Sequence, residues 1–148
     1  MRAYERLLKY AVIRTPSDEF SESAPSSACQ FELAELLVKE LQELGLSDAE
    51  ADEYCYVYAH LPATAGMEDR KCMGLIAHID TVSDFCGHDI TPVITPEYDG
   101  KDLPLGTSGR ILSPSMFPHL KSLKGQTLIT TDGTTVLGAC LLYTSRCV

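Results

Sequence analysis

A largely apolar run that ends in a histidine and an aspartate constrains this chain more than any other feature. Residues Cys72–Ala77 are apolar at successive positions, which predicts a strand over Cys72–Ile79 that is covered on both faces of an α/β sheet. Side chains two apart on a strand point the same way, so His78 and Asp80 share a face while Ile79 turns inward. Strand ends in α/β sheets carry sites. An imidazole beside a carboxylate suits a metal ligand and the acid that orients it.

Length and composition indicate a globular protein. The 148 residues suffice for one domain, and 45% are hydrophobic against 22% charged. A net charge of −9 argues against nucleic acid and anionic membranes as partners. No apolar stretch reaches the roughly 20 residues of a spanning helix. Glu5 and Lys9 interrupt the N-terminal apolar run, so it lacks the core of a signal peptide, and we expect a cytoplasmic protein.

The cysteines fit that expectation. They show no close-paired metal spacing, and their positions are Cys29, Cys55, Cys72, Cys86, Cys140 and Cys147. An even number permits disulfides, but without an export signal reduced thiols are favoured.

Two helices are predicted in the first third of the chain. Arg2–Val12 is amphipathic, and Pro16 follows it. Ser27 and Gln30 have the spacing of a capping box before a second helix. Leucines recur in that helix at helical spacing, at Leu33, Leu37, Leu41 and Leu44. Gly45 suits the position just after its end.

Strands are predicted further along. Tyr54–Leu61 alternates, with its tyrosines on one side; they fit strand packing or, as an alternative, an aromatic surface for a ligand. The stretch 84–124 is rich in proline and glycine and weakly periodic, which indicates a long functional loop. Leu128–Thr131 and Thr134–Leu137 flank an Asp-Gly pair, a pattern that predicts a hairpin.

Two sequence blocks resemble a known family. Gly74-Leu-Ile-Ala-His-Ile-Asp-Thr81 resembles the first metal-binding segment of the M20 metallopeptidases. The second block contains Leu112-Ser-Pro114, Met116-Phe-Pro118, Gly125–Gly133 and Val136–Ala139, and it narrows the resemblance to the aminopeptidases of that family that act on tripeptides. The likeness runs from about residue 2 to residue 139. It implies that residues 1–139 are the N-terminal part of a three-layer αβα catalytic domain of zinc-aminopeptidase type.

The resemblance also implies chemistry. Two zinc ions would share a bridging aspartate and a water, with a glutamate base, and short peptides, tripeptides in particular, would be the substrates. His78 matches a zinc ligand, and Asp80 matches the active-site acid that holds its imidazole. The family also implies a smaller inserted domain and a homodimer. The residues that would bind the substrate are not identified.

The chain departs from the family pattern after Ala139. The family continues there with two aspartates, the first of which bridges the metals, whereas this chain has Cys140 and ends at Val148. The glutamate base and the other zinc ligands would lie further on. Cys-Leu-Leu-Tyr-Thr-Ser is also one reading frame of a transposase end used in sequencing libraries, so residues 140–148 are predicted to be a non-native tail from sequence assembly.

Two alternatives remain open. The 148-residue chain itself would be catalytically inert, because one zinc ligand cannot hold a metal centre. A different class of protein is an acidic α/β interaction module in which His-x-Asp is incidental. Taken alone, His78 could equally be a hydrogen-bonded histidine at a strand end, and Asp80 a turn residue.

Overall fold

The computed structural model describes residues 1–83, 90–106 and 108–133. The chain divides into two units, which are described separately: Met1–Ile13 with Asp84–Leu137, and Arg14–Ser83 with Gly138–Val148. The predicted second hairpin arm, residues 134–137, and the predicted foreign tail, residues 140–148, lie outside the described residues.

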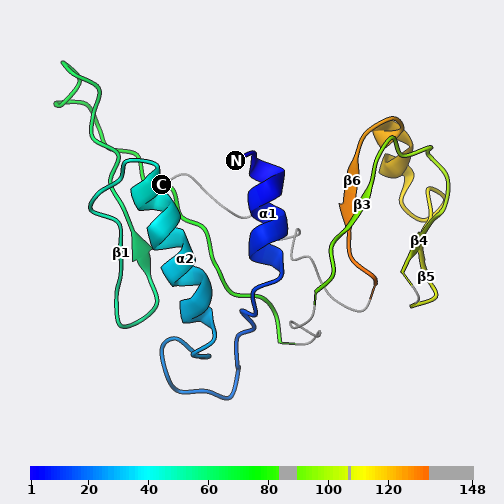
Figure 1. Ribbon diagram of the computed structural model, residues 1–148, viewed down its shortest axis with the longest axis horizontal. Coiled ribbons are helices and arrows are strands. Elements are labelled where there is room, and N and C mark those ends of the chain that lie inside the picture. The colour runs from blue at the N-terminus through cyan, green and yellow to red at the C-terminus, as the bar shows by residue number, and fades with distance from the viewer. Residues whose placement is uncertain (84–89, 107, 134–148) are drawn as a thin grey trace. The chain divides into compact units, whose positions relative to one another are not determined.

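Helix α1, Ala3–Ala11, confirms the first predicted helix (Figure 1). Its start is closed by Glu5, whose carboxylate accepts the backbone N–H of Arg2 at 2.6 Å. Glu5 in the first turn and Lys9 in the last also suit the helix dipole.

Helix α2, Gln30–Glu43, confirms the second predicted helix, but the capping box proposed for Ser27 is wrong. The residue at the N-cap is Cys29, and Gln30 donates its side-chain amide to the carbonyl of Pro16 at 3.4 Å. The C-terminal prediction is confirmed. Gly45 has φ +96°, and the N–H groups of Gly45 and Leu46 bond to the carbonyls of Gln42 and Leu41, at 2.9 and 3.0 Å, which closes the helix in a Schellman motif.

A short hairpin packs beside α2. Strands β1, Glu50–Ala51, and β2, Val57–Tyr58, pair antiparallel, and both contact α2 (Figure 1). The buried apolar side chains here belong to Leu33, Ala34, Ala49 and Cys55. Glu40, a charged residue of α2, is buried as well.

Strand β2 is shorter than the predicted strand over 54–61. The carboxylate of Asp52 accepts the backbone N–H groups of Tyr54 and Tyr56, both at 2.9 Å. This side chain therefore competes with the ladder for those donors and makes a turn, with Cys55 at φ 67°.

The prediction of a buried strand over 72–79 is wrong for the described structure. The segment is exposed: Met73, Leu75 and Ile76 keep 66%, 74% and 65% of their surface accessible. It contains one bridge residue, Leu75, and no strand. An apolar run becomes a buried strand only when neighbouring strands and helices cover it, and the described residues supply no such cover.

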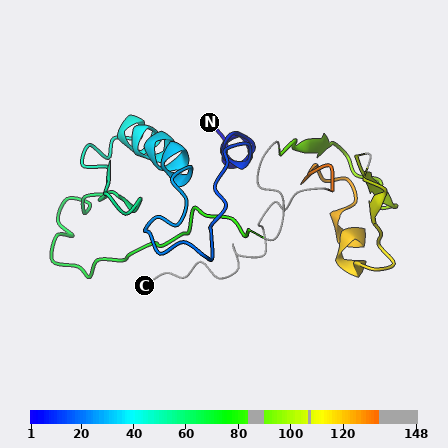
Figure 2. The ribbon, with the colours of Figure 1, turned by 90° about the horizontal axis from the view of Figure 1, so that it is seen from below.

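The other unit contains four elements that the sequence did not predict, the strands β3, β4 and β5 and a 3₁₀ helix. Strand β3, Val93–Thr95, pairs antiparallel with β6, Leu128–Thr130, and β4, Leu103–Leu105, pairs with β5, Arg110–Leu112 (Figure 2). A 3₁₀ helix, η1, spans Pro118–Leu123. Only β6 matches a predicted strand.

Tyr98 fastens the β3–β6 end of this unit. Its backbone N–H donates to the carbonyl of Gln126 at 2.8 Å, and its own carbonyl accepts the N–H of Gly125 at 2.7 Å. The ring is 2% exposed, and its hydroxyl donates to the carbonyl of Lys101. Burial raises the pKa of this phenol above its ordinary value.

Two glycines allow the β4–β5 turn and the end of β6 to touch. A Cβ on Gly133 would lie 2.4 Å from the Ser108 hydroxyl, and a Cβ on Gly106 would lie 2.9 Å from the Cβ of Asp132. Both glycines have positive φ, 85° and 52° respectively. The Asp132-Gly133 pair therefore serves close contact between two loops.

The described residues form helices and three two-stranded antiparallel sheets, an arrangement compatible with part of an α/β protein. The three-layer αβα domain stays a prediction. Across the described ranges, no helix has both the length and the apolarity to cross a membrane.

Candidate metal centre

The predicted His-x-Asp pair is in contact. The Nδ1 atom of the His78 ring lies 3.0 Å from Oδ1 of Asp80 and 2.8 Å from the backbone oxygen of Asp80. The two side chains therefore lie together, although the segment that carries them is not a strand. They are 42% and 44% exposed, so a solute can reach them.

These contacts set the tautomer of the imidazole. Both neighbours of His78 Nδ1 are oxygen acceptors, so Nδ1 carries the proton. The lone pair is then on Nε2, which is the nitrogen left to bind a metal. A carboxylate that accepts from the second nitrogen of a metal-binding histidine holds the ring in place and raises its basicity.

The residues that follow His78 are hydrogen-bonded to a part of the chain that is distant in sequence. Thr15–Ser17, which we call the anchor segment, forms a parallel bridge with Thr81. The N–H of Thr81 donates to the carbonyl of Thr15 at 2.9 Å, and the carbonyl of Thr81 accepts the N–H of Ser17 at 2.9 Å and its hydroxyl at 3.1 Å. Thr15 is 3% exposed. The sequence signal for this pairing is slight, because one bridge leaves no periodic pattern.

A complete metal site is not found among the described residues. No group of three or more histidine, cysteine, aspartate or glutamate side chains is gathered there to hold an ion. Zinc sites use about three or four protein ligands. His78 therefore fits as one ligand of such a site, with Asp80 as its partner.

A second histidine–carboxylate pair was missed in the sequence, because its members are twelve residues apart. Nδ1 of His60 lies 2.7 Å from Oδ2 of Asp48, and the backbone N–H of His60 donates to Oδ1 of the same carboxylate at 3.1 Å. The His60 side chain is 82% exposed. Backbone donation from His60, followed by its ring, lowers the pKa of Asp48 below its ordinary 3.8. This pair ties the start of β1 to the chain after β2.

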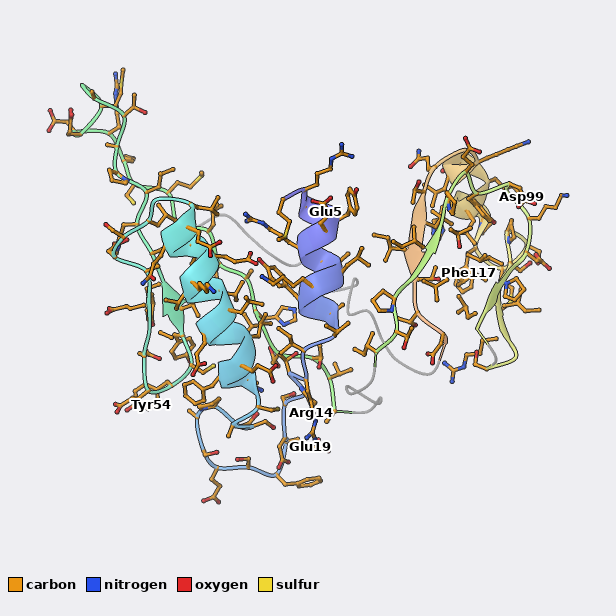
Figure 3. The ribbon with its side chains drawn as sticks, in the orientation of Figure 1. Glu5, Arg14, Glu19, Tyr54, Asp99 and Phe117 are labelled. Atoms are coloured by element: carbon orange, nitrogen blue, oxygen red, sulfur yellow. The ribbon has the colours of Figure 1, made fainter. Side chains whose placement is uncertain are left out.

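Two other histidines and the tyrosines of the predicted strand are the remaining candidates. His119 stacks edge-on against Phe117, and His88 lies outside the described residues. The tyrosines of the predicted strand stay about half exposed; Tyr56 and Tyr58 lie 6.3 Å apart, and Figure 3 shows Tyr54 at the turn between β1 and β2.

A surface hollow in the other unit contains no histidine or cysteine. It is lined by Gly100–Asp102 and Ser113–Ser115. Within it the hydroxyl of Ser113 donates to Asp102 at 2.6 Å, which joins the residue before β4 to the residue after β5.

Comparison with known proteins shows that this chain is similar in sequence to peptidase T from several bacteria. No family model matches it. It is 52% identical over 137 residues to peptidase T of Alkaliphilus oremlandii, with 91% of this chain and 34% of that protein aligned. It is 51% identical over 141 residues to peptidase T of Caldanaerobacter subterraneus, aligning 93% of this chain and 34% of the relative. The peptidase T of Bacillus subtilis is 46% identical over 136 residues, with 91% and 33% aligned.

The chain is a homologue of peptidase T. The family resemblance read from the two sequence blocks is confirmed by these relatives. The chain spans about a third of the length of the curated relatives it matches. Within this peptidase T homologue, the described structure brings the side chains of His78 and Asp80 into contact.

Proposed function

We propose that this chain is the first part of a zinc-dependent aminopeptidase that releases the N-terminal residue from tripeptides. The observation that carries the proposal is the contact between His78 Nδ1 and Asp80 in a chain about half identical to peptidase T. The names of the relatives support peptide cleavage; the zinc ions, the tripeptide preference and a homodimer belong to the proposal.

The chain's own residues would take two roles. His78 would offer Nε2 to a zinc ion, since its Nδ1 proton is held by Asp80. Asp80 would stabilise the positive charge that builds on the ring and would fix its direction. Bound zinc supplies a water that loses its proton near neutral pH and an electrophile for the scissile carbonyl. The other ligands and the base would come from chain beyond the described residues.

Domain boundaries are part of the same proposal. We propose that residues 1–139 belong to the peptidase catalytic domain and that residues 140–148 are not native. Sequencing the locus across codons 139–148 tests the second statement. A genuine cysteine codon at position 140 followed by the same tail and a stop would refute it.

The activity is tested on the longer protein encoded at the locus, with tripeptides against dipeptides and tetrapeptides. We expect tripeptide hydrolysis that a zinc chelator abolishes and added zinc restores. Asp80→Asn should lower kcat/KM by about 10- to 100-fold, as loss of such a partner does elsewhere. His78→Gln should lower it further and reduce the zinc content measured by mass spectrometry.

The matched control is the second histidine–carboxylate pair. His60→Gln and Asp48→Asn remove a contact of the same chemistry at 2.7 Å and should leave kcat/KM within about twofold. Equal losses in both pairs would contradict the assignment of His78. A longer protein without peptidase activity would favour the acidic interaction module instead.

A further inference from the structure

We infer that the anchor segment, held from α2 by Gln30, is a positioning device for the imidazole of His78. The inference rests on the proposed function, because it gives Thr15–Ser17 and Gln30 a purpose in directing a metal ligand. It concerns residues that no part of the predicted site includes.

One peptide group links the anchor segment to the ring. The carbonyl of the Asp80–Thr81 peptide accepts Nδ1–H of His78 at 2.8 Å, and the N–H of the same peptide donates to the carbonyl of Thr15 at 2.9 Å. A peptide group is planar and rigid. Turning its N–H end therefore turns the oxygen that holds the imidazole.

Ser17 fixes the other side of Thr81. Its N–H and its hydroxyl both donate to the Thr81 carbonyl, at 2.9 and 3.1 Å. Thr81 is thus bonded to the anchor segment through both of its backbone groups. Residues 72–78, which lead into the site, are exposed, so packing along them restrains the position of Thr81 little and these hydrogen bonds carry more of it.

Gln30 connects this arrangement to the most regular helix of the unit. Its side chain is buried, with the residue 6% exposed, and its amide donates to the carbonyl of Pro16 at 3.4 Å. The first residue of α2 therefore fixes the middle of the anchor segment. The buried amide of Gln30 therefore holds the anchor segment, and the anchor segment holds Thr81 beside His78.

The experiment reads the tautomer of His78 by two-bond proton–nitrogen NMR of the 148-residue chain, at a pH where the spectrum itself shows a neutral ring. The chain carries Leu75→Lys/Ile76→Lys throughout, to limit association through those exposed side chains. The wild-type ring should carry its proton on Nδ1. Gln30→Glu removes the donor at constant length, and Ser17→Ala removes the hydroxyl. Each should raise the ratio of rings protonated on Nε2 to rings protonated on Nδ1 by about fivefold, since a net hydrogen bond contributes about 1 kcal/mol.

Two controls separate positioning from general damage. Gln42→Glu breaks a bond of the same kind in the same helix, from the Gln42 amide to the Ala49 carbonyl at 3.0 Å, and should leave the tautomer unchanged. Ser17→Thr keeps the hydroxyl and should restore the wild-type ratio. If Gln30→Glu fails to fold, the Ser17 pair of variants decides.

Unchanged tautomers in Ser17→Ala and Gln30→Glu, with α2 signals intact, would overturn the inference. A shift in Gln42→Glu as large as in Gln30→Glu would overturn it too. The tautomer is measured without peptide or metal, so failure of tripeptide hydrolysis in the longer protein would refute the proposed function and leave this result distinct.

Discussion

Helix α2 and the segment 72–79 belong to the same unit and were both predicted from apolar patterns, yet only the helix forms as predicted. α2 satisfies its backbone groups within itself and closes at Gly45. The segment 72–79 has its backbone groups and apolar side chains largely uncovered. The difference teaches that a helix makes its backbone hydrogen bonds within its own residues, whereas a buried strand forms only when other strands and helices pair with it and cover it.

The largest effect should come from the uncovered segment. We expect the 148-residue chain to self-associate at micromolar concentration, because Leu75 and Ile76 would leave water on contact. The double variant Leu75→Lys/Ile76→Lys should lower the associated fraction by about tenfold, measured by sedimentation velocity. Leu61→Lys, at a position 84% exposed in a loop, is the control and should change little. A monomeric wild-type chain would contradict the conclusion that the apolar side chains of residues 72–79 are uncovered, in contrast to those of α2.

The next largest effect concerns a buried leucine of helix α2. Leu33 lies in the α2–hairpin core at 7% exposure, whereas Leu44 on the same leucine series is 58% exposed. Leu33→Ala should lower the free energy of unfolding by about 2–3 kcal/mol, and Leu44→Ala by less than about 0.5 kcal/mol. Urea titration followed by circular dichroism measures both. Similar losses would mean that the whole leucine series is buried.

A smaller effect tests whether α2 ends by its own chemistry. Gly45 has φ +96° and open space around its Cβ position, so only backbone strain opposes a side chain there. Gly45→Ala should cost about 1 kcal/mol, and Gly45→Asn less, since asparagine tolerates this conformation. The same urea titration applies. An alanine variant as stable as the wild type would show that tertiary contacts, and not the Schellman motif, end the helix.

The smallest effect concerns acid stability of the hairpin beside α2. The pKa of Asp48 is lowered, so its contribution is complete above about pH 4 and is lost as pH falls through the lower folded value. Between about pH 5 and pH 2.5, Asp48→Asn should lose less Tm than the wild type. Asp69→Asn, in an exposed loop, serves as the control and should follow the wild-type curve. Parallel curves for all three proteins would remove the His60–Asp48 contact from the stability of this region.

The parts of the fold that could be predicted from the sequence are those that depend on interactions between residues close in sequence. Both helices follow from periodicity, and the glycine after α2 follows from the conformation that a helix end requires, whereas the capping box at Ser27 did not form. The sheets depended on partners far along the chain: β3 and β6 pair across more than thirty residues, and β4 and β5 lie in a stretch read as an irregular loop. Strands as short as three residues give no measurable alternation.

The candidate site divides in the same way. The His78–Asp80 contact was predictable because the two residues are neighbours in sequence. The anchor at Thr15–Ser17 joins the site across sixty-four residues through backbone groups, which every sequence offers equally. The His60–Asp48 pair was missed for the related reason that one loop brings distant residues together.

The close approach of Gly106 and Gly133 carries a consequence for how such proteins diverge. Each glycine leaves room for a neighbour in the opposite loop, Asp132 for one and Ser108 for the other. A side chain gained in one loop would need a smaller residue or a shifted turn in the other. The two loops are therefore expected to accept mutations only in matched pairs, so that they evolve as one piece although 27 positions separate the two glycines.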